Sequence, residues 1–173
     1  TADLKAGDYV YITGTLYVAR DAAHKRMMEV LDEGKELPFN IQDQTIFYVG
    51  PTPSKPGQVF GSGGPTTSGR MDAYSPRLIK LGLHAMIGKG YRSDAVKKAI
   101  VDYHGVYFGA IGGAGAMMSS CIEECEVIAF DDLGPEAIRK LKVKNMPLVV
   151  VIDHLGNDLY EIGRKNYLKK DCK

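Results

Sequence analysis

Glycines, hydroxyl residues and one arginine are concentrated in the stretch GSGGPTTSGRMD, residues 61–72. Its central part, GPTTSGR, comes close to the phosphate-binding loop G-x-x-x-x-G-K-[ST]. In that loop a serine or threonine follows the cation and binds magnesium, whereas Met71 follows Arg70 here and cannot ligate the ion. Residues 51–64 also lack the buried strand that leads into such a loop. The stretch therefore needs an anionic ligand other than a nucleotide.

The residue types in this stretch suit a small carboxylate. Glycines let backbone N–H groups approach an anion, and a helix that starts near Thr67 or Ser68 would direct its positive end toward it. Arg70 can hold a carboxylate through two parallel hydrogen bonds. The alternative is that Thr66 and the two hydroxyl residues after it only cap the helix.

Two further groups of residues could take part in the same chemistry. ARDAAHKR, residues 19–26, places Arg20 and His24 after the first expected strand, where α/β proteins keep ligand sites. Lys89 lies between two glycines in IGKG, just past an apolar strand. A solvated arginine, a packing or capping histidine and a lysine in an exposed turn are the alternatives. Together with Arg70 these cations favour a dicarboxylic acid as substrate.

The composition limits the function classes. The chain has 173 residues and a formal net charge of +1, with no long run of either sign, which argues against a nucleic-acid or anionic membrane surface. Its cysteines, Cys121, Cys125 and Cys172, match no zinc spacing and are expected as free thiols in a reducing cytoplasm. Cys121 and Cys125 could share a helix face and hold a metal, but core packing is favoured. We expect a cytoplasmic protein without a signal peptide or membrane span.

The hydrophobic pattern predicts an α/β protein, a single domain over 1–173 with no dividing linker. We expect strands at 8–13, 16–18, 45–49, 85–88, 106–111, 126–130, 148–152 and 158–162. We expect helices at 22–33 (capped by Asp21), 68–81, 93–103 and 135–141, and a glycine-rich turn with a short helix around 112–121. The polar segment 163–173 is expected to be a frayed tail.

Four segments carry a resemblance to a known family: GTLYVARDAAHKR, FYVGPTPSKPGQVFGSGGPTTSGRMD, AMIGKG and FDDLGPEAIRKLKVKNMPLVVVIDHLGND. They resemble the beta subunit, or carboxyl-terminal domain, of iron–sulfur class I fumarate hydratases and tartrate dehydratases. The resemblance implies a swivelling domain, with a mixed sheet flanked by helices, that closes over an alpha subunit. It implies that this partner, and not this chain, holds a four-iron, four-sulfur (4Fe–4S) cluster. A heterotetramer or an isolated homo-oligomer is the expected assembly.

The same resemblance assigns roles to individual residues. Thr66 looks like the residue that exchanges the substrate C3 proton, and Arg20 and Arg70 look like carboxylate clamps. Lys89 resembles the family lysine beside the substrate. No metal ligand is assigned to this chain. The expected neighbours of the site are His24, Gly64 and Thr67.

These roles imply one function and leave two alternatives open. The first is the beta subunit of a hydro-lyase that reversibly hydrates fumarate to L-malate and is inactive without its alpha subunit. The second is an L-tartrate dehydratase beta subunit, whose substrate differs by one hydroxyl. The third, from another class, is a non-catalytic module that binds a dicarboxylate.

Overall fold

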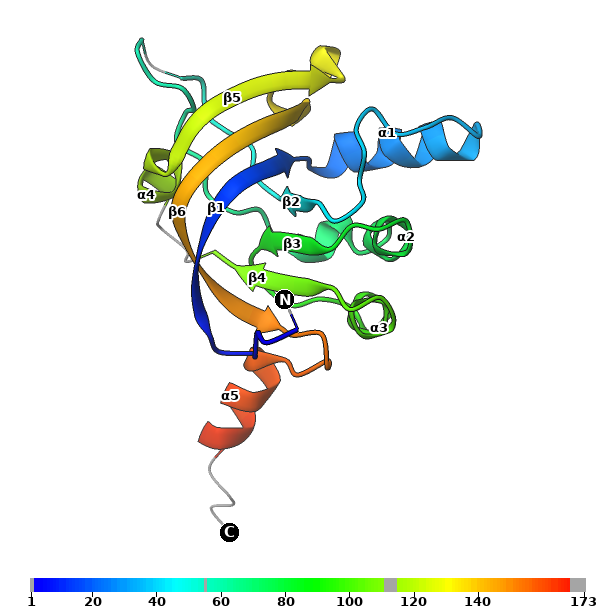
Figure 1. The fold of residues 1–173 in the computed structure, drawn as a ribbon, viewed down its shortest axis with the longest axis vertical. Coiled ribbons are helices and arrows are strands. Elements are labelled where there is room, and N and C mark those ends of the chain that lie inside the picture. Colours follow the sequence, from blue (N-terminus) through cyan, green and yellow to red (C-terminus); the bar gives the residue numbers. More distant parts are fainter. Residues whose placement is uncertain (1, 55, 111–114, 169–173) are drawn as a thin grey trace.

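A mixed β-sheet forms the centre of the molecule (Figure 1). The structure is a computed structural model that describes residues 2–54, 56–110 and 115–168. The strand order is β1-β2-β3-β4-β6-β5, in which β1 to β4 are parallel and β6 is antiparallel to its neighbours β1, β4 and β5. The strands are β1 Tyr9–Val18, β2 Thr45–Phe47, β3 Ala85–Gly88, β4 Val106–Gly109, β5 Ile122–Ala129 and β6 Ile138–Ile152. The predicted α/β class and mixed sheet are confirmed.

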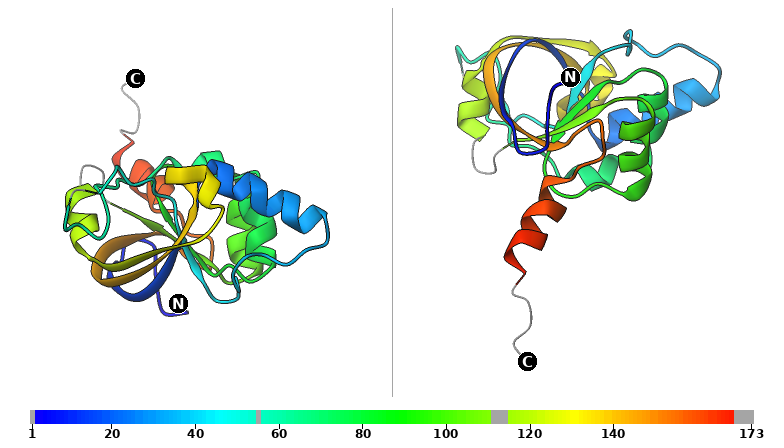
Figure 2. Two further views of the ribbon diagram at one scale, coloured as in Figure 1. Left: turned by 90° about the horizontal axis from the view of Figure 1, so that it is seen from above. Right: turned by 60° about the horizontal axis from the view of Figure 1, so that its bottom comes forward.

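The pairing of β1 with β6 closes five strands into a small barrel. Figure 2 shows these two strands curling around the barrel. Because side chains alternate across a strand, every second residue points into the barrel. Its interior is packed with apolar side chains, among them Leu16, Val18, Phe47, Ile87 and Leu148.

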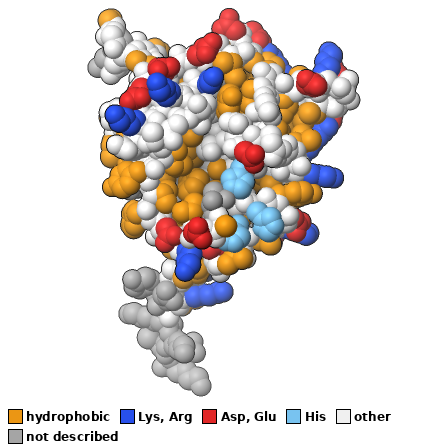
Figure 3. Space-filling model, viewed as in Figure 1, with side chains coloured by type: hydrophobic (Ala, Val, Ile, Leu, Met, Phe, Trp, Pro, Cys, Tyr) orange, Lys and Arg blue, Asp and Glu red, His pale blue; other side chains and the backbone are white. Residues whose placement is uncertain are grey.

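The outer face of the barrel also carries apolar side chains. Tyr9 and Tyr11 of β1 are strongly exposed and lie in register with Val149 and Pro147 of β6. Figure 3 shows hydrophobic side chains gathered on this face of the molecule. The alternation of β1 therefore leaves an aromatic pair in solvent.

Helices pack on the sheet outside the barrel, and α1, α2 and α3 lie together on one side (Figure 1). A second apolar cluster fills the space beneath them, with Met27, Ile46, Leu78, Met86 and Ile100 among its members. The helices are α1 Asp21–Asp32, α2 Ser75–Lys80, α3 Asp94–Asp102, α4 Gly115–Ser120 and α5 Leu159–Tyr167, with 3₁₀ turns η1 Ser68–Met71 and η2 Asp131–Glu136.

The prediction of a helix at 135–141 is wrong. This segment ends η2 and then begins β6, in which Ile138, Leu141 and Val143 are buried. Pro135 indicates a helix start, and the spacing of Ile138 and Leu141 also fits one helical turn. Pairing with β1 on one side and β5 on the other makes this segment a strand. Residues 122–125 also extend the strand that was expected to begin at 126.

The predicted strand at 158–162 is also wrong. Asp158 accepts a hydrogen bond from the Tyr160 N–H at 2.9 Å and caps helix α5. Because α5 continues to Tyr167, residues 163–167 are helical rather than a frayed tail. Residues 169–173 of the expected tail lie outside the described residues, as does most of the glycine-rich turn expected before α4.

Three smaller expectations near the site also need correction. The single helix expected at 68–81 is divided into η1 and α2, with Pro76 in the first turn of α2. The break expected at Gly14 is a register shift within a continuous β1, where glycine has a φ of +139°. Arg20, and not Asp21, occupies the N-cap position of α1.

Candidate functional site

The predicted site residues lie at one edge of the sheet. Because β1 to β4 are parallel, their carboxyl ends share that edge, where α/β proteins bind ligands. Arg20 comes two residues after β1, and Lys89 directly follows β3. Thr66 is joined to the chain beyond β2, since its N–H donates to the Tyr48 carbonyl at 2.7 Å.

Arg20 and Arg70 meet at one carboxylate, that of Asp21. Arg70 Nε forms an ion pair with Asp21 Oδ1 at 2.8 Å, and Arg20 Nη2 lies 3.8 Å from Asp21 Oδ2. The Arg20 guanidinium also lies over Gly50, where a Cβ atom would overlap Nη1. The two arginines expected to clamp carboxylates are therefore neighbours held by a common anion.

A second carboxylate, that of Glu136, approaches the same cluster from η2. Its Oε1 lies 3.5 Å from Arg20 Nη2, and its Oε2 accepts from the Ala22 N–H at 2.7 Å. Arg20 itself makes no side-chain cap at the start of α1. Glu136 thus caps α1 in its place, from 114 residues away.

The threonine-containing loop is tied to the lysine turn by Ser68. The Ser68 N–H donates to the Lys89 carbonyl at 2.9 Å, and the Lys89 N–H donates back to Ser68 Oγ at 3.1 Å. The Tyr107 hydroxyl lies 2.9 Å from Ser68 Oγ and 3.0 Å from the Gly90 carbonyl oxygen. A side chain at Gly88 would overlap Ser68 Oγ, so this close approach needs a glycine. Thr66 and Lys89 are therefore positioned by one hydrogen-bonded unit.

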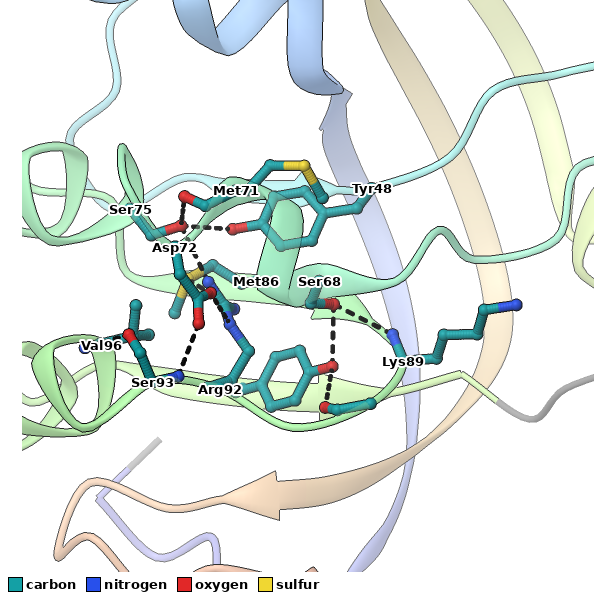
Figure 4. A network of polar contacts seen from close by, with 12 residues as sticks. Tyr48, Ser68, Met71, Asp72, Ser75, Met86, Lys89, Arg92, Ser93 and Val96 are labelled. Carbon is teal, nitrogen blue, oxygen red and sulfur yellow. Dashed lines mark hydrogen bonds and ion pairs between the residues drawn. The ribbon is translucent and has the colours of Figure 1, made fainter.

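Beneath this unit lies a buried polar network around Arg92 (Figure 4). Arg92 Nε donates to Asp72 Oδ1 at 2.7 Å, and Nη2 donates to Ser75 Oγ at 2.8 Å. Its guanidinium carbon lies 5.4 Å and 4.9 Å from the ring centres of Tyr48 and Tyr107. The network joins the end of GPTTSGRMD to the segment after β3. Sequence reasoning missed it because Arg92 and Asp72 have no recognisable motif spacing.

His24 is a buried component of the site's support rather than an exposed neighbour of the ligand. Its Nδ1–H donates to the Arg20 carbonyl at 2.8 Å, and its ring lies 5.4 Å from that of Tyr48. Burial lowers the pKa of His24 from 6.5 to about 4, and the nearby Arg92 charge acts in the same direction. The imidazole is therefore neutral near pH 7 and holds the backbone of Arg20.

The other predicted residues are wholly or partly exposed to solvent. The Arg70 side chain is 54% exposed, Lys89 and Thr67 are exposed, and Thr66 is half-buried. Figure 4 shows the Lys89 side chain extending away from the Arg92 network. Gly64 faces open space, since an added Cβ would have no neighbour within 4 Å. The described part of the chain thus presents a polar surface rather than an enclosed pocket at these residues.

The cysteines do not form a metal site in the described residues. No group of three or more His, Cys, Asp or Glu side chains there could hold a metal ion. Cys121 follows α4 and Cys125 lies in β5, so the two do not share a helix face, and both pack against the barrel core. This arrangement does not fit a 4Fe–4S cluster. Cys172 lies outside the described residues.

Comparison with known families identifies the chain. Residues 1–163 match the family described as "Fumarase C-terminus". The chain belongs to this family. The match covers the arginine cluster, the threonine loop and the lysine turn described above, and it confirms the resemblance seen in the sequence.

Similar proteins come from bacteria, from an archaeon and from Leishmania major. The chain is 42% identical over 152 residues to the anaerobic class I fumarate hydratase of Escherichia coli, covering 87% of this chain and 28% of that protein. It is 39% identical over 173 residues to a putative L(+)-tartrate dehydratase subunit beta of Methanocaldococcus jannaschii, covering 96% of this chain and 89% of that one. A putative class I fumarate hydratase of Geobacillus stearothermophilus is 36% identical, with 33% of its length covered.

The chain thus spans only about a third or less of the fumarate hydratases it matches. It spans most of the archaeal beta subunit. In the part of the chain that the structure describes, we find no helix of the length and apolarity that crossing a membrane requires.

Proposed function

We propose that this chain is the beta subunit of a hydro-lyase that interconverts fumarate and L-malate together with an alpha subunit. One observation carries the proposal: two arginines share Asp21 at the sheet edge that also holds Thr66 and Lys89. Its similarity to class I fumarate hydratases supports the reaction. Its coverage of a separate beta subunit supports a two-subunit assembly.

The charges of the cluster favour an anionic substrate. Arg20, Arg70 and Lys89 carry three positive charges, and the carboxylates of Asp21 and Glu136 offset two of them. Arg70 uses Nε for Asp21, and no described residue accepts from its two terminal nitrogens. Those nitrogens can bind a carboxylate as a parallel pair, which is the strongest geometry for such a contact.

Thr66 is the residue we assign to proton transfer at substrate C3. Its backbone is fixed by the Tyr48 carbonyl, and its half-buried side chain lies on the segment that Ser68 joins to the Lys89 turn. A threonine hydroxyl is a weak base, so it needs nearby cations to stabilise the alkoxide and the charge that develops on the substrate. We assign the 4Fe–4S cluster to the alpha subunit, because the described residues do not fit it.

The second candidate is an L-tartrate dehydratase beta subunit. The observation in its favour is the archaeal relative, which bears that name and is covered over 89% of its length. L-Tartrate carries the same two carboxylates plus one hydroxyl. The arginine cluster would therefore serve either substrate, and the substrates must be compared directly.

The test is anaerobic reconstitution with an iron–sulfur alpha subunit. Fumarate loss is followed by its ultraviolet absorbance, and L-tartrate is supplied in a parallel reaction. We expect hydration of fumarate by the complex and none by the isolated chain. Higher kcat/KM with L-tartrate would select the second candidate. Saturable dicarboxylate binding with no turnover of either compound would instead support a non-catalytic binding module and reject both enzymes.

A further inference from the structure

Asp21 lies at the centre of the arginine cluster, and its two carboxylate oxygens have different surroundings. Its Oδ1 forms an ion pair with Arg70 Nε at 2.8 Å, while its Oδ2 is buried and makes no hydrogen bond, although Arg20 Nη2 lies 3.8 Å away. The side chain is 28% exposed and belongs to the first residue of α1. A carboxylate beside a dicarboxylate site repels the ligand, so its presence there needs a compensating reason.

The geometry of the Arg70 contact supplies that reason. A guanidinium can receive a carboxylate along its Nε edge or between its two terminal nitrogens. Asp21 takes the Nε edge, so it blocks that approach and leaves the terminal edge for a ligand. It also restricts the rotation of a side chain that is 54% exposed and would otherwise be mobile.

Magnitudes indicate how the two effects of Asp21 compare. Its repulsion of a bound carboxylate is weak in this solvated setting. By holding Arg70 beforehand, Asp21 avoids a cost of similar size, that of immobilising a long side chain when the ligand binds. The two effects nearly cancel in binding affinity. The effect of Asp21 on the alignment of the substrate against Thr66 is not cancelled in this way. A misplaced substrate lowers the rate of the chemical step alone.

We propose that Asp21 is a positioning residue, which presents the terminal edge of Arg70 to the substrate carboxylate and keeps Arg20 beside it. This inference rests on the proposed hydro-lyase function. It requires that loss of Asp21 lowers kcat more than it changes KM. It also predicts that an oxygen acceptor at position 21 matters more for activity than a negative charge there.

Two substitutions separate the acceptor from the charge. Asp21→Ala removes both, whereas Asp21→Asn removes the charge and keeps an oxygen that can accept from Arg70 Nε. We expect Asp21→Ala to lower kcat of the reconstituted complex with fumarate by roughly tenfold or more, with KM changed by less than about threefold. Asp21→Asn should stay within about threefold of the parent in both constants. Asp32→Ala is the matched control, since Asp32 pairs with Arg77 at the far end of the same helix.

A spectroscopic readout on the full chain makes the test independent of turnover. The Nε–H of an arginine held by a carboxylate gives a resolved ¹H–¹⁵N signal, which Arg70→Lys assigns by its loss. We expect this signal to persist in Asp21→Asn and Asp32→Ala and to be lost by exchange in Asp21→Ala. Urea unfolding of each variant shows whether stability has changed.

The outcomes are distinct. Equal kinetic losses in Asp21→Ala and Asp21→Asn would mean that charge and not positioning matters, which overturns the inference. An unchanged Arg70 signal and unchanged kcat in Asp21→Ala would overturn it as well. If the parent complex fails with every dicarboxylate, the proposed function falls, and loss of the Arg70 signal in Asp21→Ala alone still supports Asp21 as the group that holds Arg70.

Discussion

Arg92 and Arg70 lie on neighbouring segments, but their side chains differ in burial and in the number of their partners. The Arg92 side chain is fully buried, donates to Asp72 and Ser75, and packs against two tyrosine rings. Arg70 is half exposed and has one carboxylate partner, at Nε. A guanidinium whose three nitrogens all have partners inside the protein supports structure, whereas one with unused terminal nitrogens can bind a ligand. Exposure and donor saturation therefore distinguish the two roles.

The largest expected effect is that of replacing the buried arginine. Arg92→Ala removes the partner of Asp72, whose side chain is 14% exposed, and should lower the free energy of unfolding by about 3–5 kcal/mol. Arg70→Ala is the matched control and should cost less than about 1 kcal/mol, because its pair with Asp21 is solvated. Urea unfolding measures both. Equal losses of stability would remove the distinction between the two arginines.

The pH dependence of stability tests whether the buried His24 stays neutral in the folded protein. The folded state keeps His24 neutral down to a pKa of about 4, whereas the unfolded chain takes up a proton near 6.5. Between these values the unfolded state binds more protons, so stability should fall as the pH is lowered from 6.5 toward 4, by about 3 kcal/mol in total. His24→Gln should flatten the profile in this window.

An exposed histidine supplies the control for that measurement. His104→Gln makes the same substitution in a solvent-accessible turn and should leave the slope of the parent in place. A parent whose urea midpoint does not change between pH 6.5 and 4 would show that His24 is not held neutral by burial.

At the solvent-exposed surface of the site, the largest expected effect is on turnover. Thr66→Ala should lower kcat of the reconstituted complex by about 10²-fold or more, with little change in KM, because we propose that the hydroxyl acts in the transition state. Thr67→Ala is the matched control, since Thr67 is the exposed neighbour in the same loop. Initial rates with fumarate measure both. A larger loss in Thr67→Ala would transfer the proposed role to Thr67.

The smallest expected effect concerns Glu136, at the boundary between the buried residues that support the site and its exposed surface. Glu136→Ala removes the acceptor for the Ala22 N–H and should lower the free energy of unfolding by about 1 kcal/mol, as for other lost helix caps. Glu136→Gln keeps an oxygen in that place and should retain most of the stability. Thermal or urea unfolding of the two variants compares them, and equal losses would mean that the cap is not the relevant contact.

Part of the fold was predictable from local pattern. The short apolar run Ala85–Gly88 was predicted at its observed bounds, and the helix expected at 93–103 is observed as Asp94–Asp102, capped by Ser93. Segments 135–141 and 158–162 were assigned to the wrong structure. In both, a few apolar residues fit either period, and contacts with distant strands or a local cap decided between them.

The candidate site was predictable to a similar extent. The residue types of Arg20, Thr66, Arg70 and Lys89 pointed to an anion, and the structure places them at one edge of the sheet. Asp21 was interpreted as a helix cap, and Glu136 was placed in a helix with no role. Glu136 could not be connected to Arg20 without the fold, because the pairing of β1 with β6 brings it to the start of α1.

The sequence by itself determined the family to which the chain belongs, and its residue types predicted the chemistry: a loop without the hydroxyl that binds magnesium in a phosphate-binding loop, and cations suited to a dicarboxylate. The tertiary structure decided which cations remain available to a ligand. Arg92 was indistinguishable from Arg70 as a residue type, and only its burial among Asp72, Ser75 and the tyrosines removes it from solvent. The physical reason is that local pattern encodes local conformation, whereas side-chain partners across a sheet depend on strand order and register.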